Sequence, residues 1–125
     1  MTPVWNKSYR EHSTIKTNPG DTRREADNAV KALDWKGAYF VDADHVGLKT
    51  VDLFLDSSNF FTLDVADFIS QKADDAVIQS FVGDNKKYIG KLQIPGIDRA
   101  FDVSEELIHQ SAVKYLFAVQ EAGKI

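Results

Sequence analysis

The chain has 125 residues, a length that fits one domain, and its composition is that of an ordinary globular protein. It has no cysteine, which excludes disulfides, thiolate metal sites and cysteine nucleophiles. Its 15 Lys and Arg residues against 19 Asp and Glu residues give a net charge of −4, which argues against nucleic acid or a membrane surface as the partner. No apolar stretch approaches the ~18 residues of a membrane span, and no signal-peptide pattern opens the sequence, so we expect a cytoplasmic protein.

The first third of the sequence predicts one strand and one helix. Residues 3–5 form a short apolar run that indicates a strand, and the polar residues 6–12 that follow are typical of a loop. Further along, Thr22 and Glu25 have the spacing of a capping box at the start of a helix. Four apolar residues at helical spacing predict its buried face: Ala26, Ala29, Val30 and Leu33.

Two apolar segments in the middle of the sequence end in carboxylates. The first begins at Tyr39 and the second at Phe60, with a brief helix predicted over residues 50–55 between them. Neither segment alternates cleanly, as expected of parallel strands that helices cover on both faces. In α/β folds, the groups that perform chemistry lie at the carboxyl ends of such strands. The two segments therefore predict a shared site for a metal or a polar substrate.

The last third of the sequence predicts two further helices. The first spans residues 70–82, and residues 92–94 are either a strand or an extended connector. Asp102 with Glu105 predicts the cap of the final helix, and Gly123 suits its end. Five residues predict the buried stripe of that helix: Leu107, Ile108, Ala112, Leu116 and Val119.

This alternation of strands and helices predicts the α/β class, built from parallel β-α-β units with right-handed crossovers. Three or four parallel strands make a narrow sheet, whereas a complete (β/α)8 barrel of the TIM type needs about 250 residues. We therefore expect residues 1–125 to form a single partial α/β domain that resembles a contiguous portion of such a barrel.

The first acidic segment supplies three candidate site residues. Strand alternation places Asp42 and Asp44 on one face, with His45 at the tip. Two carboxylates and an imidazole can bind a divalent cation, or they can hold a general base beside a substrate. The simpler interpretation is that Asp44 caps the next turn and Asp42 is only hydrogen-bonded. The cost of an aspartate within a buried strand favours the functional interpretation.

The second acidic segment places Thr62 and Asp64 on a common face by the same alternation. If the two strands are neighbours, we expect these side chains to line one concavity with Asp42 and Asp44. Asp64 is equally well explained as a loop or capping residue, and Thr62 as an ordinary β-branched strand residue.

A third group of candidates follows the first strand. Lys7 and Arg10 suit a substrate carboxylate and Asn6 suits a hydroxyl, although a solvated loop explains the same residues. On the final helix, Glu105 and His109 are four residues apart, which is best explained as a surface pair.

Three segments of this sequence resemble the tagaturonate/fructuronate epimerase family: VWNKSYREH, YFVDADHVGLKTVDLFLDSSNFFTLDVADFI and IPGID. They cover most of the chain in order. The resemblance implies an isomerase of carbohydrate metabolism with a barrel-like α/β fold. Such an enzyme would interconvert keto-uronates such as tagaturonate and fructuronate, with a divalent cation (Mn, Ni, Co or Zn). Members of the family are much longer, so we expect this chain to be incomplete and its own activity to be uncertain.

The resemblance, together with the strand pattern, gives each candidate a role. We predict Asp42 and His45 as catalytic and Asp44 and Asp64 as metal ligands. Four residues are predicted to bind the sugar acid: Asn6, Lys7, Arg10 and Thr62. The alternative is a non-catalytic assembly or binding module derived from a truncated barrel, whose unpaired sheet edge would favour a homo-oligomer. A phosphoacceptor signalling domain is disfavoured, because too few strands follow the first acidic one.

Overall fold

The computed structural model describes all 125 residues, which divide into two compact units. Unit 1 comprises residues 1–64 and 124–125, and unit 2 comprises residues 65–123. The single domain expected from the sequence stays a prediction, because compact units are not the same as independently folding domains. None of the helices has the length and apolar character that a membrane crossing requires.

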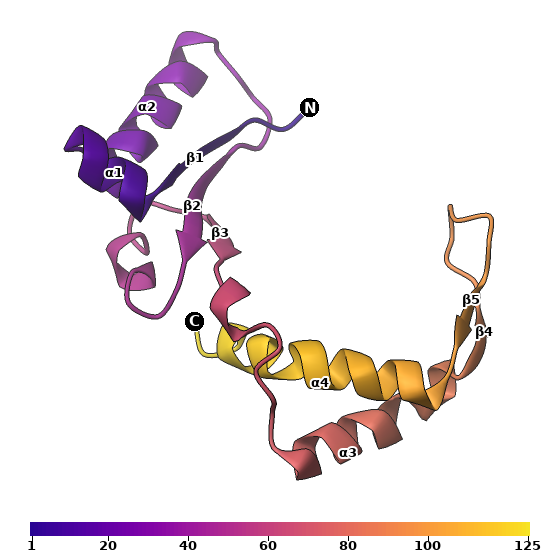
Figure 1. Cartoon of the computed structure of the whole chain (residues 1–125). Helices are drawn as coiled ribbons and strands as arrows, with labels where there is room; N and C mark the ends of the chain where they lie inside the picture. The colour runs from indigo at the N-terminus through magenta and orange to yellow at the C-terminus, as the bar shows by residue number, and fades with distance from the viewer. The chain divides into compact units, whose positions relative to one another are not determined.

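Unit 1 is built on a three-stranded parallel sheet (Figure 1). Its strands are β1 (Val4–Ser8), β2 (Phe40–Val46) and β3 (Phe60–Leu63). Helices α1 (Tyr9–Ile15) and α2 (Pro19–Ala32) connect β1 to β2, and both helices contact both of these strands. This order confirms the α/β class with parallel β-α-β units that the sequence predicts.

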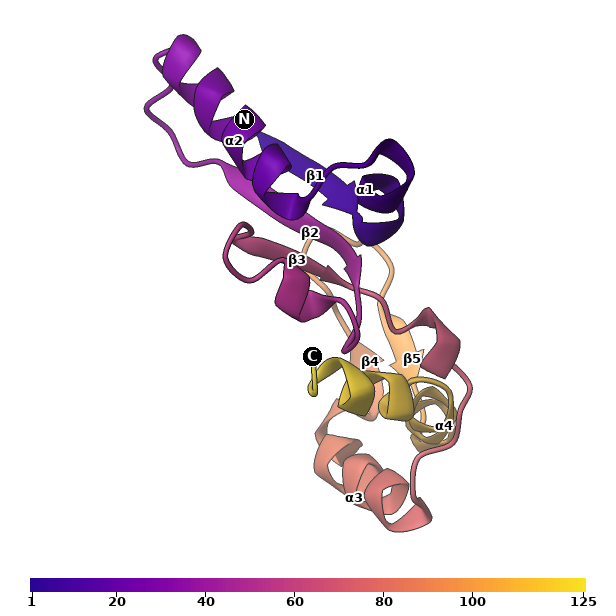
Figure 2. The same cartoon turned by 90° about the vertical axis from the view of Figure 1, so that its left-hand side faces the viewer.

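The strands lie in the order β1-β2-β3, so the two acidic segments are neighbours (Figure 2). The pairing of β1 with β2 is regular from Val4 opposite Phe40 to Ser8 opposite Asp44. The register of β2 against β3 shifts between Ala43 and Val46, at the carboxyl end of β2. The 3₁₀ helix η1 (Val51–Leu53) connects these two strands, where the sequence predicts a brief helix.

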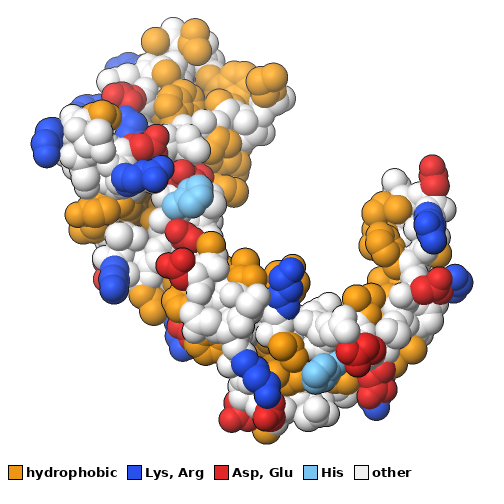
Figure 3. Space-filling model, in the orientation of Figure 1, with side chains coloured by type: hydrophobic (Ala, Val, Ile, Leu, Met, Phe, Trp, Pro, Cys, Tyr) orange, Lys and Arg blue, Asp and Glu red, His pale blue; other side chains and the backbone are white.

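The two faces of this sheet differ in how they are covered. Helices α1 and α2 lie on one side of it (Figure 1), and a buried cluster comprises Ala43, Val46, Val51 and Phe54. In contrast, Val4 remains 51% exposed and Phe60 48% exposed at the amino ends of the strands. The space-filling view shows hydrophobic side chains over this part of unit 1 (Figure 3). The expectation that both faces are buried holds for one face only.

Unit 2 contains a helical pair and a short hairpin. Helices α3 (Asp75–Asn85) and α4 (Glu105–Ala122) pack on each other through a buried apolar cluster that includes Ile78, Val82 and Ile108. The two hairpin strands pair antiparallel, which settles residues 92–94 as the end of a strand and the start of its loop. In chain order the elements of unit 2 are η2 (Ala66–Phe68), α3 (Asp75–Asn85), η3 (Lys86–Tyr88), β4 (Gly90–Leu92), β5 (Phe101–Val103) and α4 (Glu105–Ala122).

Two helix starts in unit 1 differ from the sequence prediction. The polar run of residues 6–12 is not a loop, because β1 continues to Ser8 and α1 begins at the next residue. Helix α2 begins at Pro19, where Asn18 caps it instead of Thr22. At its other end Leu33 lies beyond the last helical turn and is 80% exposed, so it does not belong to the buried face.

The final helix confirms one terminal signal and corrects the other. Gly123 is its C-cap, as predicted, whereas its N-cap is Ser104. Asp102 lies instead in β5 and pairs with Lys91. The predicted stripe is buried only in part, because Leu107 and Val119 are exposed. Glu105 forms its ion pair with Lys86 rather than with His109.

Candidate active site

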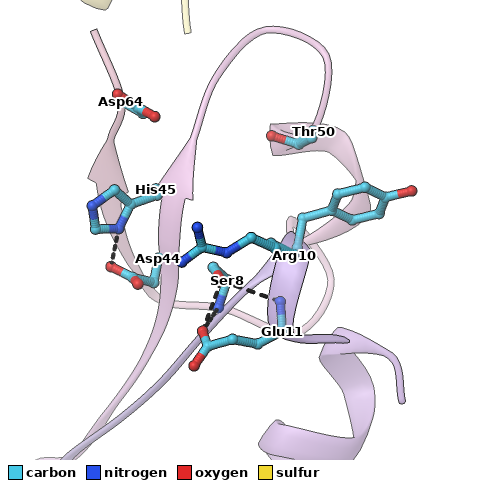
Figure 4. Close-up of a pocket in the computed structure, with 8 residues that line it drawn as sticks. Ser8, Arg10, Glu11, Asp44, His45, Thr50 and Asp64 are labelled. Carbon is cyan, nitrogen blue, oxygen red and sulfur yellow. Dashed lines mark hydrogen bonds and ion pairs between the residues drawn. The ribbon is translucent and has the colours of Figure 1, made fainter. Parts of the chain in front are cut away.

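A cavity of about 420 Å³ opens at the carboxyl ends of the parallel strands, within unit 1 (Figure 4). The residues that line it come from the end of β1, the start of α1, the end of β2 and the segments that follow β2 and β3. They are Ser8, Tyr9, Arg10, Glu11, Asp44, His45, Thr50 and Asp64. The position agrees with the prediction of a polar site where the strands end.

Asp44 and His45 are partners at the tip of β2, where Asp44 Oδ1 lies 2.8 Å from His45 Nδ1. His45 has a φ of 55°, a left-handed conformation that costs energy in a residue with a Cβ, and it lies at the register shift of the sheet. This backbone turns the imidazole back toward the preceding carboxylate (Figure 4). When Nδ1 donates its proton to Asp44, Nε2 carries the lone pair and can accept a proton.

The start of α1 supplies a second wall of the cavity. Ser8 caps the helix in a reciprocal box: its backbone N and its Oγ both donate to Glu11 Oε2, at 2.8 and 2.7 Å. These hydrogen bonds, the backbone one first, lower the pKa of Glu11 below its ordinary value. Arg10 is the only Lys or Arg among the lining residues, and its side chain extends from α1 toward Asp44 (Figure 4).

The remaining lining residues belong to the segments after β2 and β3. Thr50 Oγ1 accepts from Gly47 N at 3.2 Å and donates to Gly47 O at 3.3 Å, which closes the turn after β2. The backbone N of Asp64 donates to Val46 O at 2.8 Å, so this residue directly continues the pairing of β3 with β2. The pairing of the neighbouring strands β2 and β3 is therefore what places Asp64 beside the Asp44–His45 pair.

Asp42 and Thr62 do not line the cavity, contrary to the expectation of one concavity shared by all four residues. They pair with each other, since Thr62 Oγ1 donates to Asp42 Oδ2 at 2.9 Å. Asp42 is only 6% exposed, and its Oδ1 has no hydrogen-bond partner. Both residues lie two positions before the acids at the strand ends, further from the cavity along their strands. Alternation correctly predicts on which face of a strand a side chain lies. It does not predict whether that side chain is near enough to the end of the strand to reach the cavity.

Asn6 and Lys7 also lie outside the lining, and both belong to β1 rather than to a loop that follows it. Of the three predicted ligands in that polar run, the structure brings only Arg10 to the cavity. Sequence reasoning did not single out Ser8, Tyr9, Glu11 or Thr50. The Ser8-x-x-Glu11 spacing of a capping box was the available signal for the wall that α1 supplies.

The predicted metal centre requires several ligand side chains close together. No three His, Asp or Glu residues of the chain come close enough to hold one metal ion together. The cavity does gather Asp44 and Asp64, the two predicted ligands, but Asp44 is also the partner of His45. Structural and catalytic protein sites for such cations commonly use three or more protein ligands. The residues of this chain alone therefore do not fit a complete metal centre.

The fold and the cavity define an α/β protein with a polar site at the ends of a parallel sheet. Two solved structures of the fructuronate-tagaturonate epimerase UxaE from Cohnella laeviribosi share this fold. The native structure gives a TM-score of 0.65 at 16% identity, over 99% of this chain and 33% of that one. The glycerol complex gives 0.63 at 13% identity, over 95% and 32%. No protein-family model and no curated protein matches the sequence.

These matches confirm, for the fold, the resemblance inferred from the sequence. The chain spans about a third of the length of the solved epimerase that it matches. At this level of identity the likeness concerns the arrangement of the backbone alone.

Proposed function

We propose that this chain forms part of the active site of a carbohydrate epimerase that interconverts keto-uronates such as tagaturonate and fructuronate. The observation that supports the proposal most directly is the cavity at the strand ends, which combines the Asp44–His45 pair with Arg10. It lies within a fold shared with an enzyme named for that reaction. Its volume of about 420 Å³ lies within the ~300–1,000 Å³ range of small-molecule sites.

Arg10 is the residue that we assign to the carboxylate of the sugar acid. A guanidinium binds a carboxylate through two parallel hydrogen bonds, and no other Lys or Arg lines the cavity. Lys7, which the sequence offered as an equal candidate, lies within β1 and away from the lining. The carboxylates of Asp44 and Asp64 are acceptors for the hydroxyl groups of a sugar.

His45 is the residue that we assign to proton transfer. Inversion of a carbinol centre proceeds either by loss and return of a proton at carbon or by cleavage and reclosure of a C–C bond. Both routes begin with the removal of a proton by a base, from carbon in the first and from a hydroxyl in the second. Asp44 holds Nδ1 of His45 and leaves Nε2 as the accepting nitrogen. Asp42 is not assigned to this step, because it does not reach the cavity.

A divalent cation remains part of the proposal for the complete enzyme. Three carboxylates but only one Arg line the cavity, so a bound cation would offset the excess negative charge. Asp44 and Asp64 would be its ligands from this chain, and it would polarise the keto group as a Lewis acid. Because this chain supplies fewer than three ligands, we route no step through the metal.

The proposal is tested by calorimetric titration of the 125-residue protein with fructuronate and with the matching neutral sugar fructose. We expect saturable binding of the acid only, and loss of that binding in Arg10→Gln. Lys7→Gln is the matched control, since it removes one positive charge close in sequence without changing the lining. Equal binding of both sugars, or an equal loss in both variants, would contradict the assignment.

A further inference from the structure

A second polar feature of unit 1 is a buried histidine that the proposed mechanism does not use. His12 lies on α1, two residues after Arg10, and is only 3% exposed. Its ring packs against the buried Phe54 with 6.0 Å between the ring centroids. It is therefore the side chain that anchors this short helix to the interior of unit 1.

Only one nitrogen of this imidazole has a hydrogen-bond partner. Nδ1 lies 2.8 Å from Thr17 Oγ1, whereas the buried Nε2 has none. A neutral ring needs no donor at Nε2 when Nδ1 carries the proton. A protonated ring would place an N–H without an acceptor, and a positive charge, in the interior. Both changes disfavour the docked helix.

We propose that His12 is a positioning residue that keeps α1 docked only while its imidazole is neutral, so that mild acid releases the Arg10 wall of the candidate site. The same helix carries Tyr9, Arg10 and Glu11, all of which line the cavity at the strand ends. Tyr9 also lines a second cavity, of about 530 Å³, together with His12. Movement at His12 is thus transmitted to the candidate site through fewer than two turns of helix.

The charged groups around His12 shift its pKa in opposite directions. Burial lowers the pKa of His12 from its ordinary value of 6.5, and Lys7 on β1 acts in the same direction. Asp21, Glu11 and Glu25 act in the opposite direction, so they moderate the effect. Two further charged side chains, those of Arg23 and Asp56, line the second cavity together with His12.

The sign of the pH dependence follows from proton binding. As the pH falls below about 6.5, an undocked His12 takes up a proton while the docked one still resists it. The docked form therefore loses stability relative to the undocked form through this range. Its stabilising contribution is fully present above this range, where both forms are neutral.

Nuclear magnetic resonance of the 125-residue protein tests this coupling directly, from about pH 8 to about pH 5. We expect the His12 imidazole signals and the backbone amide signals of residues 9–11 to change with one shared midpoint, below 6.5. In His12→Gln, which cannot become charged, those amide signals should show no such transition. His109→Gln, on α4 of unit 2, is the matched control and should keep the transition.

Two results would overturn the inference: amides 9–11 that stay unchanged while His12 titrates, or an unaltered transition in His12→Gln. The wild-type titration decides the question even if that variant fails to fold. The effect of α1 docking on the binding of a sugar acid rests on the proposed function. The pH titration contains no sugar, so it tests the docking of α1 by itself. If mild acid lowers the docked fraction of the wild type tenfold, its apparent Kd for fructuronate should rise about tenfold. The same change of pH should not raise the apparent Kd of His12→Gln in this way.

Discussion

The two units of this protein differ in where they place polar groups. The buried polar residues Ser8, His12, Thr22, Asp42 and Ser57 all lie in unit 1, and unit 2 has only Glu121. The cavity of unit 1 at the strand ends is lined by charged side chains, whereas the α3–α4 side of unit 2 has a cavity lined mostly by apolar ones. Buried polar groups cost stability unless they are paired, so unit 1 carries the greater cost of burying them.

The largest effect that we expect concerns the packing beneath the site. Phe54 is 1% exposed and contacts both the buried cluster of unit 1 and the ring of His12. Phe54→Ala should lower the free energy of unfolding by about 3–5 kcal/mol, because it removes a large buried side chain and leaves a cavity. Denaturant unfolding measures this change. Phe60→Ala is the control: this ring is half exposed, and an equal loss there would contradict the assignment of the core.

A smaller loss should follow from breaking the buried pair of Asp42 and Thr62. Thr62→Val removes the only hydrogen bond to the Asp42 carboxylate, whose other oxygen already has no partner. We expect a loss of about 1–3 kcal/mol. In an Asp42→Leu background the same substitution should cost much less. Additive effects in this double-mutant cycle would show that the pair does not interact.

The capping box of α1 should contribute less again. Ser8→Ala removes the side-chain acceptor for the Glu11 backbone N–H, and should cost about 0.5–2 kcal/mol. Ser13→Ala, on the exposed side of the same helix, should change stability far less. If thermal unfolding shows equal losses, the cap is not what starts this helix.

The smallest effect concerns acid pH. The pKa of Glu11 is lowered in the folded protein by hydrogen bonds from Ser8, so its contribution is present above the unfolded value of 4.5. That contribution is lost as the pH falls through the lower folded value. Glu11→Gln should therefore flatten the pH dependence of stability in this range, as measured by urea unfolding at several pH values. An unchanged profile would contradict the assignment.

The sequence predicted the architecture of unit 1 better than the details of its site. The near-continuous apolar runs before Asp42 and Asp64 correctly indicated parallel strands, the structure makes these strands neighbours, and the cavity lies where they end. The separation of Asp42 from Asp44 was not predictable, because alternation assigns both to one face. The left-handed conformation of His45 was also not predictable, since it lies at a register shift between β2 and β3 that the sequence pattern does not mark.

In unit 2 the hydrophobic pattern was a weaker guide. Apolar spacing on α4 placed Ile108 and Ala112 in the interior correctly, but it also selected Val119, which is exposed. The apolar stripe of a helix identifies residues that can be buried. How much of the helix surface the packed element covers decides which of these residues are buried. The short hairpin of β4 and β5 gave no alternation long enough to recognise.

We propose that the polar cavity of unit 1 binds a sugar acid through Arg10. The most direct test of this proposal is to follow the backbone amide signals of the 125-residue protein while fructuronate is added at neutral pH. We expect saturable shifts at the residues that line the cavity, from Ser8 to Glu11 and around Asp44, with unit 2 unaffected and no response in Arg10→Gln. Shifts confined to unit 2, or none at saturating concentrations of the sugar acid, would contradict it.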